Sequence, residues 1–90
     1  MPSKMVQRQF QDAFGQSPFR LTKDTAMALS GVSLDKFRSI HRTPRDLSRT
    51  LAQAKRYDGH ETRPLAAQFG VTAKTMAIRL DELGLVAQWG

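Results

Sequence analysis

The sequence predicts an all-α protein of about six short helices with almost no sheet. Three observations predict this class: apolar residues recur at helical spacing, glycines and prolines separate the segments, and capping residues precede most of them. Two similar turns further predict two tandem helix-turn-helix-like units of three helices each, 1–42 and 43–90. Because each unit is too small to be more than marginally stable alone, we expect them to pack as one compact domain over 1–90.

In the first half, the helical spacing of apolar residues and the turn and capping residues predict three helices. Gly15 closes the first helix, and Thr22 is the expected N-cap of the second. Ser33 caps the third, on which Phe37 and Ile40 are expected to face inward. The expected helices of this half are 5–14, 23–30 and 34–41.

The second half opens with a strong helix start over residues 43–46, Thr-Pro-Arg-Asp. Thr is a good cap, Pro favours the first helical position, and the acid completes a capping box. This helix is expected to run to about Asp58, and a short helix then leads to a last one capped by Thr72. The segment 85–89 is expected to form a short strand or an apolar tail docked on the helices. The expected helices of this half are 44–58, a short one from Glu61 or Thr62 to Phe69, and 73–83.

The positive charge lies in one stretch, residues 36–56, which we call the basic segment. It contains seven basic side chains and one acid and carries +6, whereas the other 69 residues sum to zero. A net charge of +6 and a pI near 10.6 indicate an anionic partner, with nucleic acid the leading candidate. A solvated helix face is the alternative, but such complete segregation favours contacts with DNA phosphates. A helix reaching Asp58 would also place Arg45, Arg49 and Arg56 on one face.

The two similar turns are Gly31-Val32-Ser33 and Gly70-Val71-Thr72, 39 residues apart. Glycine supplies a positive φ and the hydroxyl residue fixes where the next helix begins, as in the helix-turn-helix motif of DNA-binding proteins. The second copy fits well, with the small Ala66 four positions before its glycine. The first has the larger Met27 there. A tight helix corner without DNA needs the same glycine and cap, so that interpretation stays open.

Residues 65–85 resemble the helix-turn-helix segment that follows the catalytic domain in the ImmA/IrrE family of phage- and stress-linked metallopeptidases. The matching positions are Phe69, Val71, Thr72, Met76, Arg79, Leu80, Leu83 and Leu85. The resemblance covers about a quarter of the chain and implies a helix-turn-helix module of phage or mobile-element type. It does not extend to the family's metal site, which needs two His four apart on one helix with a Glu beside the first. His60 is followed by Glu61, but position 64 is Pro.

The last helix fits the second turn but is less suited to DNA, because Asp81 and Glu82 would repel phosphates. We therefore expect residues 33–56 to bind duplex DNA, with Lys74 the one cation added by the last helix. The expected DNA-binding residues are Ser33, Lys36, Arg38, Ser39, Arg42, Arg45, Arg49, Lys55, Arg56 and Lys74. The last helix and tail are expected to form a dimer or protein-partner surface through Ala77, Ile78, Val86 and Trp89.

The composition argues against other classes of function. The chain has no Cys and only two His, so we expect no metal and no cofactor. No nucleophile–base pair, carboxylate pair or phosphate loop suggests an enzyme or a small-molecule substrate. No apolar run is long enough for a membrane span, and a cytoplasmic location is expected.

The leading hypothesis is a small DNA-binding transcriptional regulator or accessory protein of phage type. The alternative is a non-enzymatic adaptor that binds a protein such as the transcription machinery. RNA binding is weaker, because the aromatic residues fall on core faces.

Overall fold

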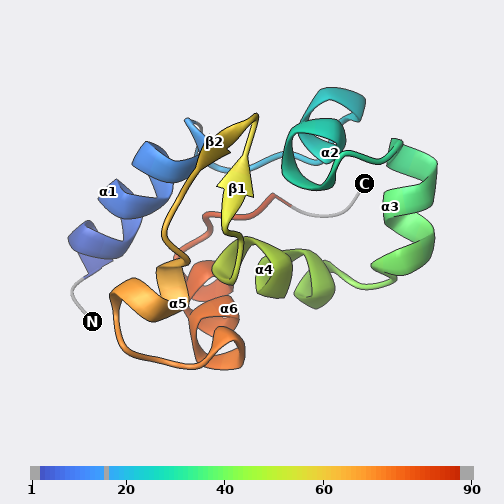
Figure 1. Ribbon diagram of the computed structural model, residues 1–90. Helices are drawn as coiled ribbons and strands as arrows, with labels where there is room; N and C mark the ends of the chain where they lie inside the picture. Colours follow the sequence, from blue (N-terminus) through green and yellow to red (C-terminus); the bar gives the residue numbers. More distant parts are fainter. Residues whose placement is uncertain (1–2, 16, 88–90) are drawn as a thin grey trace.

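Helices dominate the protein, as the sequence predicts, and a small hairpin interrupts them (Figure 1). The computed structural model describes residues 3–15 and 17–87. Within these residues the elements are α1 Ser3–Phe14, α2 Lys23–Ser30, α3 Leu34–Ile40, α4 Pro44–Ala52, β1 Arg56–Tyr57, β2 His60–Glu61, α5 Leu65–Gln68 and α6 Ala73–Glu82. In Figure 1, α1 lies on one side and α3 on the other, with the hairpin between α1 and α2 and the α4–α6 pair below it.

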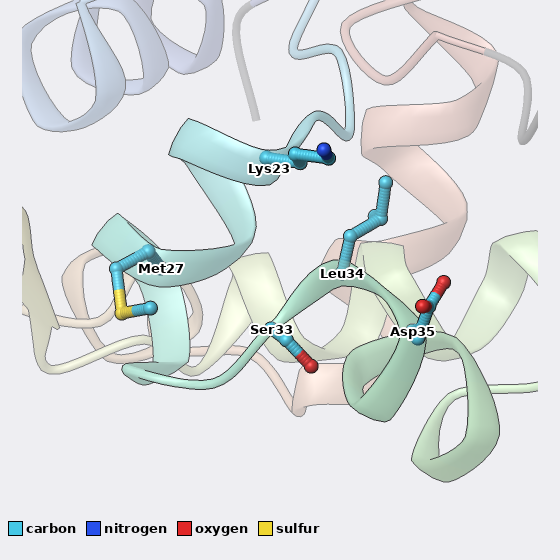
Figure 2. Close-up of a pocket in the computed structure, with 5 residues that line it drawn as sticks. All are labelled: Lys23, Met27, Ser33, Leu34 and Asp35. Atoms are coloured by element: carbon cyan, nitrogen blue, oxygen red, sulfur yellow. The ribbon is translucent and has the colours of Figure 1, made fainter.

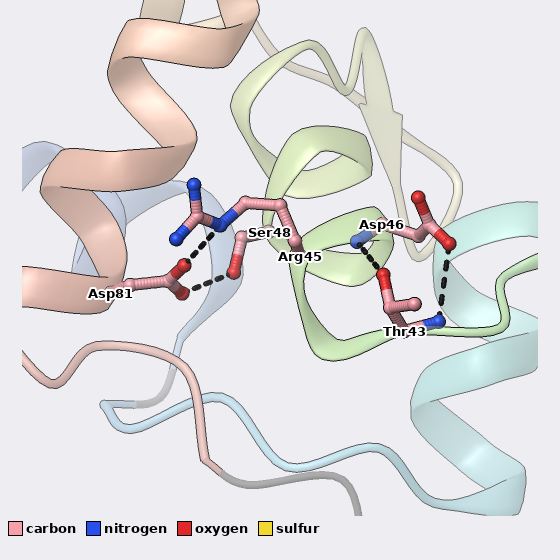
Figure 3. A network of polar contacts seen from close by, with 5 residues as sticks. All are labelled: Thr43, Arg45, Asp46, Ser48 and Asp81. Atoms are coloured by element: carbon pink, nitrogen blue, oxygen red, sulfur yellow. Dashed lines mark hydrogen bonds and ion pairs between the residues drawn. The ribbon is translucent and has the colours of Figure 1, made fainter.

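The expected N-caps are confirmed at four helices. The hydroxyls of Thr22, Ser33, Thr43 and Thr72 each accept a hydrogen bond from the backbone N–H three residues later. At α4 the capping box is complete, because the Asp46 carboxylate also accepts from the Thr43 N–H at 3.1 Å (Figure 3). Each cap satisfies an N–H group that the helix leaves unpaired, so the sequence fixes where these helices begin.

The predicted continuation of α4 to Asp58 is wrong. The helix ends at Ala52, and the chain then forms an antiparallel hairpin in which Arg56 pairs with Glu61 and Tyr57 with His60. Asp58 and Gly59 form the turn with φ of 52° and 78°. Asp-Gly at two positive-φ positions is a preferred two-residue hairpin connection, and this local preference ends the helical pattern. The short helix α5 is correspondingly shorter than expected and begins after Pro64.

The hydrophobic core draws side chains from both halves of the chain. α1 contributes Val6, Phe10 and Phe14 at helical spacing, and all three are buried. The Phe14 ring meets those of Phe19 and Tyr57 edge-on, with centroids 5.7 and 5.2 Å apart. The residues of the second half in the same buried cluster are Leu47, Leu51, Ala52, Leu65, Ala66, Met76, Leu80 and Leu85.

The C-terminal tail docks on the first half, which is one of the two expected arrangements. The Phe19 N–H donates to the Leu85 carbonyl, and the Ala87 N–H donates to the Phe19 carbonyl, each at 2.8 Å. These bonds form an isolated parallel bridge between Phe19 and Val86. Leu85 is buried beside it. The tail therefore ties the chain after α6 to the segment between α1 and α2.

The two predicted turns form different corners. Gly31 and Gly70 both have the positive φ that the turn requires, 71° and 66°. At the second corner Ala66 is buried, as a close helix crossing demands, whereas Met27 at the same place in the first corner is 55% exposed. The predicted inward orientation of Ile40 is also wrong, because this last residue of α3 is 59% exposed. Phe37 is buried in the core instead, and Leu34 is partly buried against it.

No helix in the described part of the chain has the length and apolarity that a membrane span requires.

Candidate nucleic-acid interface

The basic segment runs through α3, the connector 41–43, α4 and β1. Six of its seven basic side chains are exposed, and Arg38 is half-buried on α3. The exposed cations are Lys36, Arg42, Arg45, Arg49, Lys55 and Arg56. The fold thus leaves most of the excess positive charge in contact with solvent.

Phe37 is the buried core residue of α3. The Phe37 side chain is fully buried, and its ring stacks on His41 with centroids 4.2 Å apart. His41 Nδ1 also lies 3.2 Å from the Phe37 carbonyl oxygen, which fixes the start of the connector. Burying Phe37 turns Lys36 and Ser39 outward, because neighbouring residues on a helix face different directions.

The two predicted serine contacts have structural roles on α3. The Ser33 hydroxyl accepts from the Lys36 N–H at 3.3 Å as the helix cap. The Ser39 hydroxyl donates to the Lys36 carbonyl at 2.9 Å. Both side chains are exposed, but each already has a backbone partner. The cations are therefore better placed than the serines to supply the binding energy.

α4 places Arg45 and Arg49 one turn apart on its exposed face, opposite the buried Leu47 and Leu51. This helix packs on α6. A polar contact crosses that packing: Arg45 Nε lies 2.8 Å from Asp81 Oδ2, and the Ser48 hydroxyl donates to Asp81 Oδ1 at 2.5 Å (Figure 3). Ser48 is fully buried, so the Asp81 carboxylate is held from beneath while Arg45 reaches it from the surface.

The prediction that Arg56 shares a helical face with Arg45 and Arg49 is wrong, and neither Lys55 nor Arg56 lies on a helix. Since α4 ends at Ala52, both lie on the extended chain that enters the hairpin. The Lys55 carbonyl accepts from the Thr62 N–H at 2.9 Å, and the Asp58 N–H donates to the Ala28 carbonyl at 2.8 Å. The first bond closes the hairpin at its base, and the second holds its turn against α2.

The expected partner surface on α6 is corrected at one position. Ala77 is fully buried, because it lies on the same side of α6 as Met76 and Leu80, and it cannot contact a partner. Ile78 is 38% exposed, and Val86 is half-buried at its backbone bridge with Phe19. Trp89 lies outside the described residues. Lys74, the predicted cation of α6, is exposed in its first turn.

The single acid of the basic segment has a structural role. The N–H groups of Thr43 and Arg42 both donate to the Asp46 carboxylate at 3.1 Å. These bonds, that of Thr43 foremost, lower the pKa of Asp46 below its ordinary value of 3.8. Asp46 is thus ionised at neutral pH and serves the first turn of α4.

Sequence reasoning missed two features. One is the Asp81–Ser48–Arg45 contact, which joins residues more than thirty positions apart and has no local sequence signature. The other is an open cavity of about 260 Å³ between α2 and α3, lined by Lys23, Met27, Ser33, Leu34 and Asp35 (Figure 2). Figure 2 shows Met27 on one side of it and Leu34 with Asp35 on the other.

Among the described residues, no group of three or more His, Asp or Glu could hold a metal ion.

Comparison of the chain with protein-family models, with curated proteins and with solved structures gives no match.

Proposed function

We propose that this protein is a small transcriptional regulator or accessory protein that binds duplex DNA through α3, the connector 41–43 and the exposed face of α4. The observation that carries the proposal is the distribution of charge. The basic segment carries +6 while the remainder of the chain is neutral, and six of the seven cations are exposed. DNA phosphates are the commonest partner of such a surface.

The two corners support the same proposal. α2–α3 and α5–α6 are each a pair of short helices joined through a positive-φ glycine and a capped second helix, as in tandem helix-turn-helix-like units. The resemblance of residues 65–85 to a phage-type module favours the same class. α3 is the candidate recognition helix, because its two cations outnumber its single acid, Asp35. On α6 two cations, Lys74 and Arg79, are balanced by Asp81 and Glu82. A homodimer would supply two such helices for one site.

The proposal sets the expected salt dependence. If Arg42, Arg45, Arg49, Lys55 and Arg56 each neutralise one phosphate, the slope of log K against log salt is about −4.5, at roughly −0.9 per contact. Affinity should then fall several-hundred-fold between about 50 and 200 mM salt. A cationic surface that serves only solubility would give no such complex.

Fluorescence anisotropy on a labelled mixed-sequence duplex, repeated at several salt concentrations, tests the proposal. Arg42→Ala should weaken binding and reduce the slope by about 0.9, because one phosphate contact is lost. Lys74→Ala is the matched control on α6 and should change affinity much less. Arg38→Ala should also weaken binding much more than Lys74→Ala, with thermal unfolding monitored because Arg38 is half-buried. Equal losses from all three variants would contradict the assignment to residues 33–56, and no binding at low salt would overturn the function.

A second candidate function is a protein-binding adaptor, and the cavity between α2 and α3 favours it. Met27 and Leu34 give this cavity an apolar wall beside the charged Lys23 and Asp35, a combination suited to a protein side chain. An adaptor would bind its partner with a weak salt dependence and would lose affinity on Met27→Ser. That substitution adds no charge and should leave DNA binding nearly unchanged, so the same variant separates the two functions.

A further inference from the structure

The contact between α4 and α6 places an acid directly against a proposed DNA-binding cation. Asp81 Oδ2 lies 2.8 Å from Arg45 Nε, and the other oxygen, Oδ1, accepts from Ser48. We propose that Asp81 is a positioning residue that holds Arg45 in place to bind a backbone phosphate of duplex DNA at the α4–α6 junction. The inference rests on the proposed function and assigns one of its contacts.

The geometry leaves the donors that a phosphate needs. A guanidinium has five N–H groups, and Asp81 lies against the Nε edge. The Arg45 atom that meets Asp81 is Nε, and the Arg45 side chain is 49% exposed. Figure 3 shows both terminal nitrogens extending beyond the backbone of α4 toward α6. One N–H from each terminal nitrogen points away from the Nε edge, and this end-on pair suits an anion, which Arg recognises with two parallel hydrogen bonds.

The hydrogen bond from Ser48 to Asp81 explains why the Asp81–Arg45 pair is ordered in the protein without DNA. Ser48 is fully buried and its hydroxyl donates to Asp81, whose own side chain is 33% exposed. The carboxylate is thus held from α4 at one oxygen and presents the other to Arg45. A side chain already ordered in the free protein loses less freedom on binding, which favours affinity by about two- to tenfold for one long side chain.

The sign of the effect distinguishes positioning from simple repulsion. Removing an acid next to a DNA-binding surface ordinarily strengthens binding, since phosphates are then repelled less. If Asp81 positions Arg45, Asp81→Asn should instead weaken binding by about two- to tenfold and leave the salt slope nearly unchanged, because Arg45 still reaches the phosphate but must be ordered on binding. Glu82→Gln is the matched control, because it removes the same charge from the next, exposed residue of α6. It should leave affinity unchanged or strengthen it.

A double-mutant comparison separates this role from a purely structural one. In an Arg45→Ala background, Asp81→Asn should cause no further weakening, because the residue it positions is gone. A loss of stability through α4–α6 packing would instead weaken binding in both backgrounds. Where Asp81→Asn fails to fold, Arg45→Lys provides the test: it keeps the charge but lacks the planar pair of terminal nitrogens, and should weaken binding at least twofold.

Anisotropy on the mixed-sequence duplex measures all these variants under one set of conditions. Stronger binding by Asp81→Asn, matching Glu82→Gln, would overturn the positioning role while leaving DNA binding intact. Further weakening by Asp81→Asn in the Arg45→Ala background would do the same, as would unchanged affinity in Arg45→Lys. Absence of binding by the unmodified protein would instead overturn the proposed function itself, and the inference with it.

Discussion

Ala77 offers a direct test of how α6 packs, because the sequence places it on a partner surface and the structure places it in the core. Its side chain is fully buried between the neighbouring core residues Met76 and Leu80 of α6. Ala77→Leu would add three carbon atoms where the structure offers no solvent-facing space. Overpacking of this kind costs about 1–3 kcal/mol of unfolding free energy. For a domain of this size that lowers Tm by about 4–24 °C, at roughly 4–8 °C per kcal/mol.

Urea denaturation followed by circular dichroism measures the effect. The matched control is Ala67→Leu, the same substitution at an exposed helical alanine of α5, which should change the unfolding free energy by less than about 0.5 kcal/mol. Reversible unfolding with unchanged cooperativity would allow the two midpoints to be compared directly. If Ala77→Leu unfolds at the same urea concentration as Ala67→Leu, Ala77 faces solvent and the packing of α6 against α4 is incorrectly described.

Two further predictions concern the caps and corners. Asp46→Ala should destabilise α4, because it removes the acceptor of the Thr43 and Arg42 N–H groups. Since the pKa of Asp46 is lowered in the folded protein, its stabilisation is fully present above the ordinary value of 3.8. It is lost as the pH falls through the lowered pKa, so urea midpoints of the two proteins should converge in acid; a constant difference down to low pH would contradict this origin. Gly70→Ala should cost about 1–2 kcal/mol, because φ is +66° and a Cβ would meet nothing within 4 Å, which leaves backbone strain as the cause. Gly70→Asn should recover part of that loss in the same measurement, and an equal loss in both would point to a cause other than the backbone.

The helix starts could be predicted because they depend on contacts three residues apart. Thr22, Ser33, Thr43 and Thr72 cap their helices by hydrogen bonds to the residue three positions later. The end of α4 could not be placed by periodicity, although the hairpin had a local indication in Asp58-Gly59, a pair that favours two positive φ angles. Apolar spacing continued past Ala52, and the turn preference prevailed over it.

Burial was harder to predict than secondary structure, since it depends on which neighbouring element covers a residue. Ile40 has the apolar character and helical spacing of a core residue, yet α3 ends there and the described chain leaves it 59% exposed. Ala77 has the small size of a tolerant surface position, yet it is covered. Neither outcome follows from local pattern, because each is decided by the docking of α3 and α6 against elements distant in sequence.

The charged surface depends partly on the sequence and partly on the fold. That the cations gather in one stretch is a property of the sequence, and most of them are exposed because α3 and α4 are short helices whose other faces hold Phe37, Leu47 and Leu51. Which acid pairs with which cation is determined by the fold. Asp81, considered on α6 alone, argues against phosphate binding. Held by buried Ser48 and paired with Arg45, it becomes a means of ordering a cation on the neighbouring helix. A single acid can therefore count for or against DNA binding, and only the sign of the Asp81→Asn effect relative to Glu82→Gln decides which.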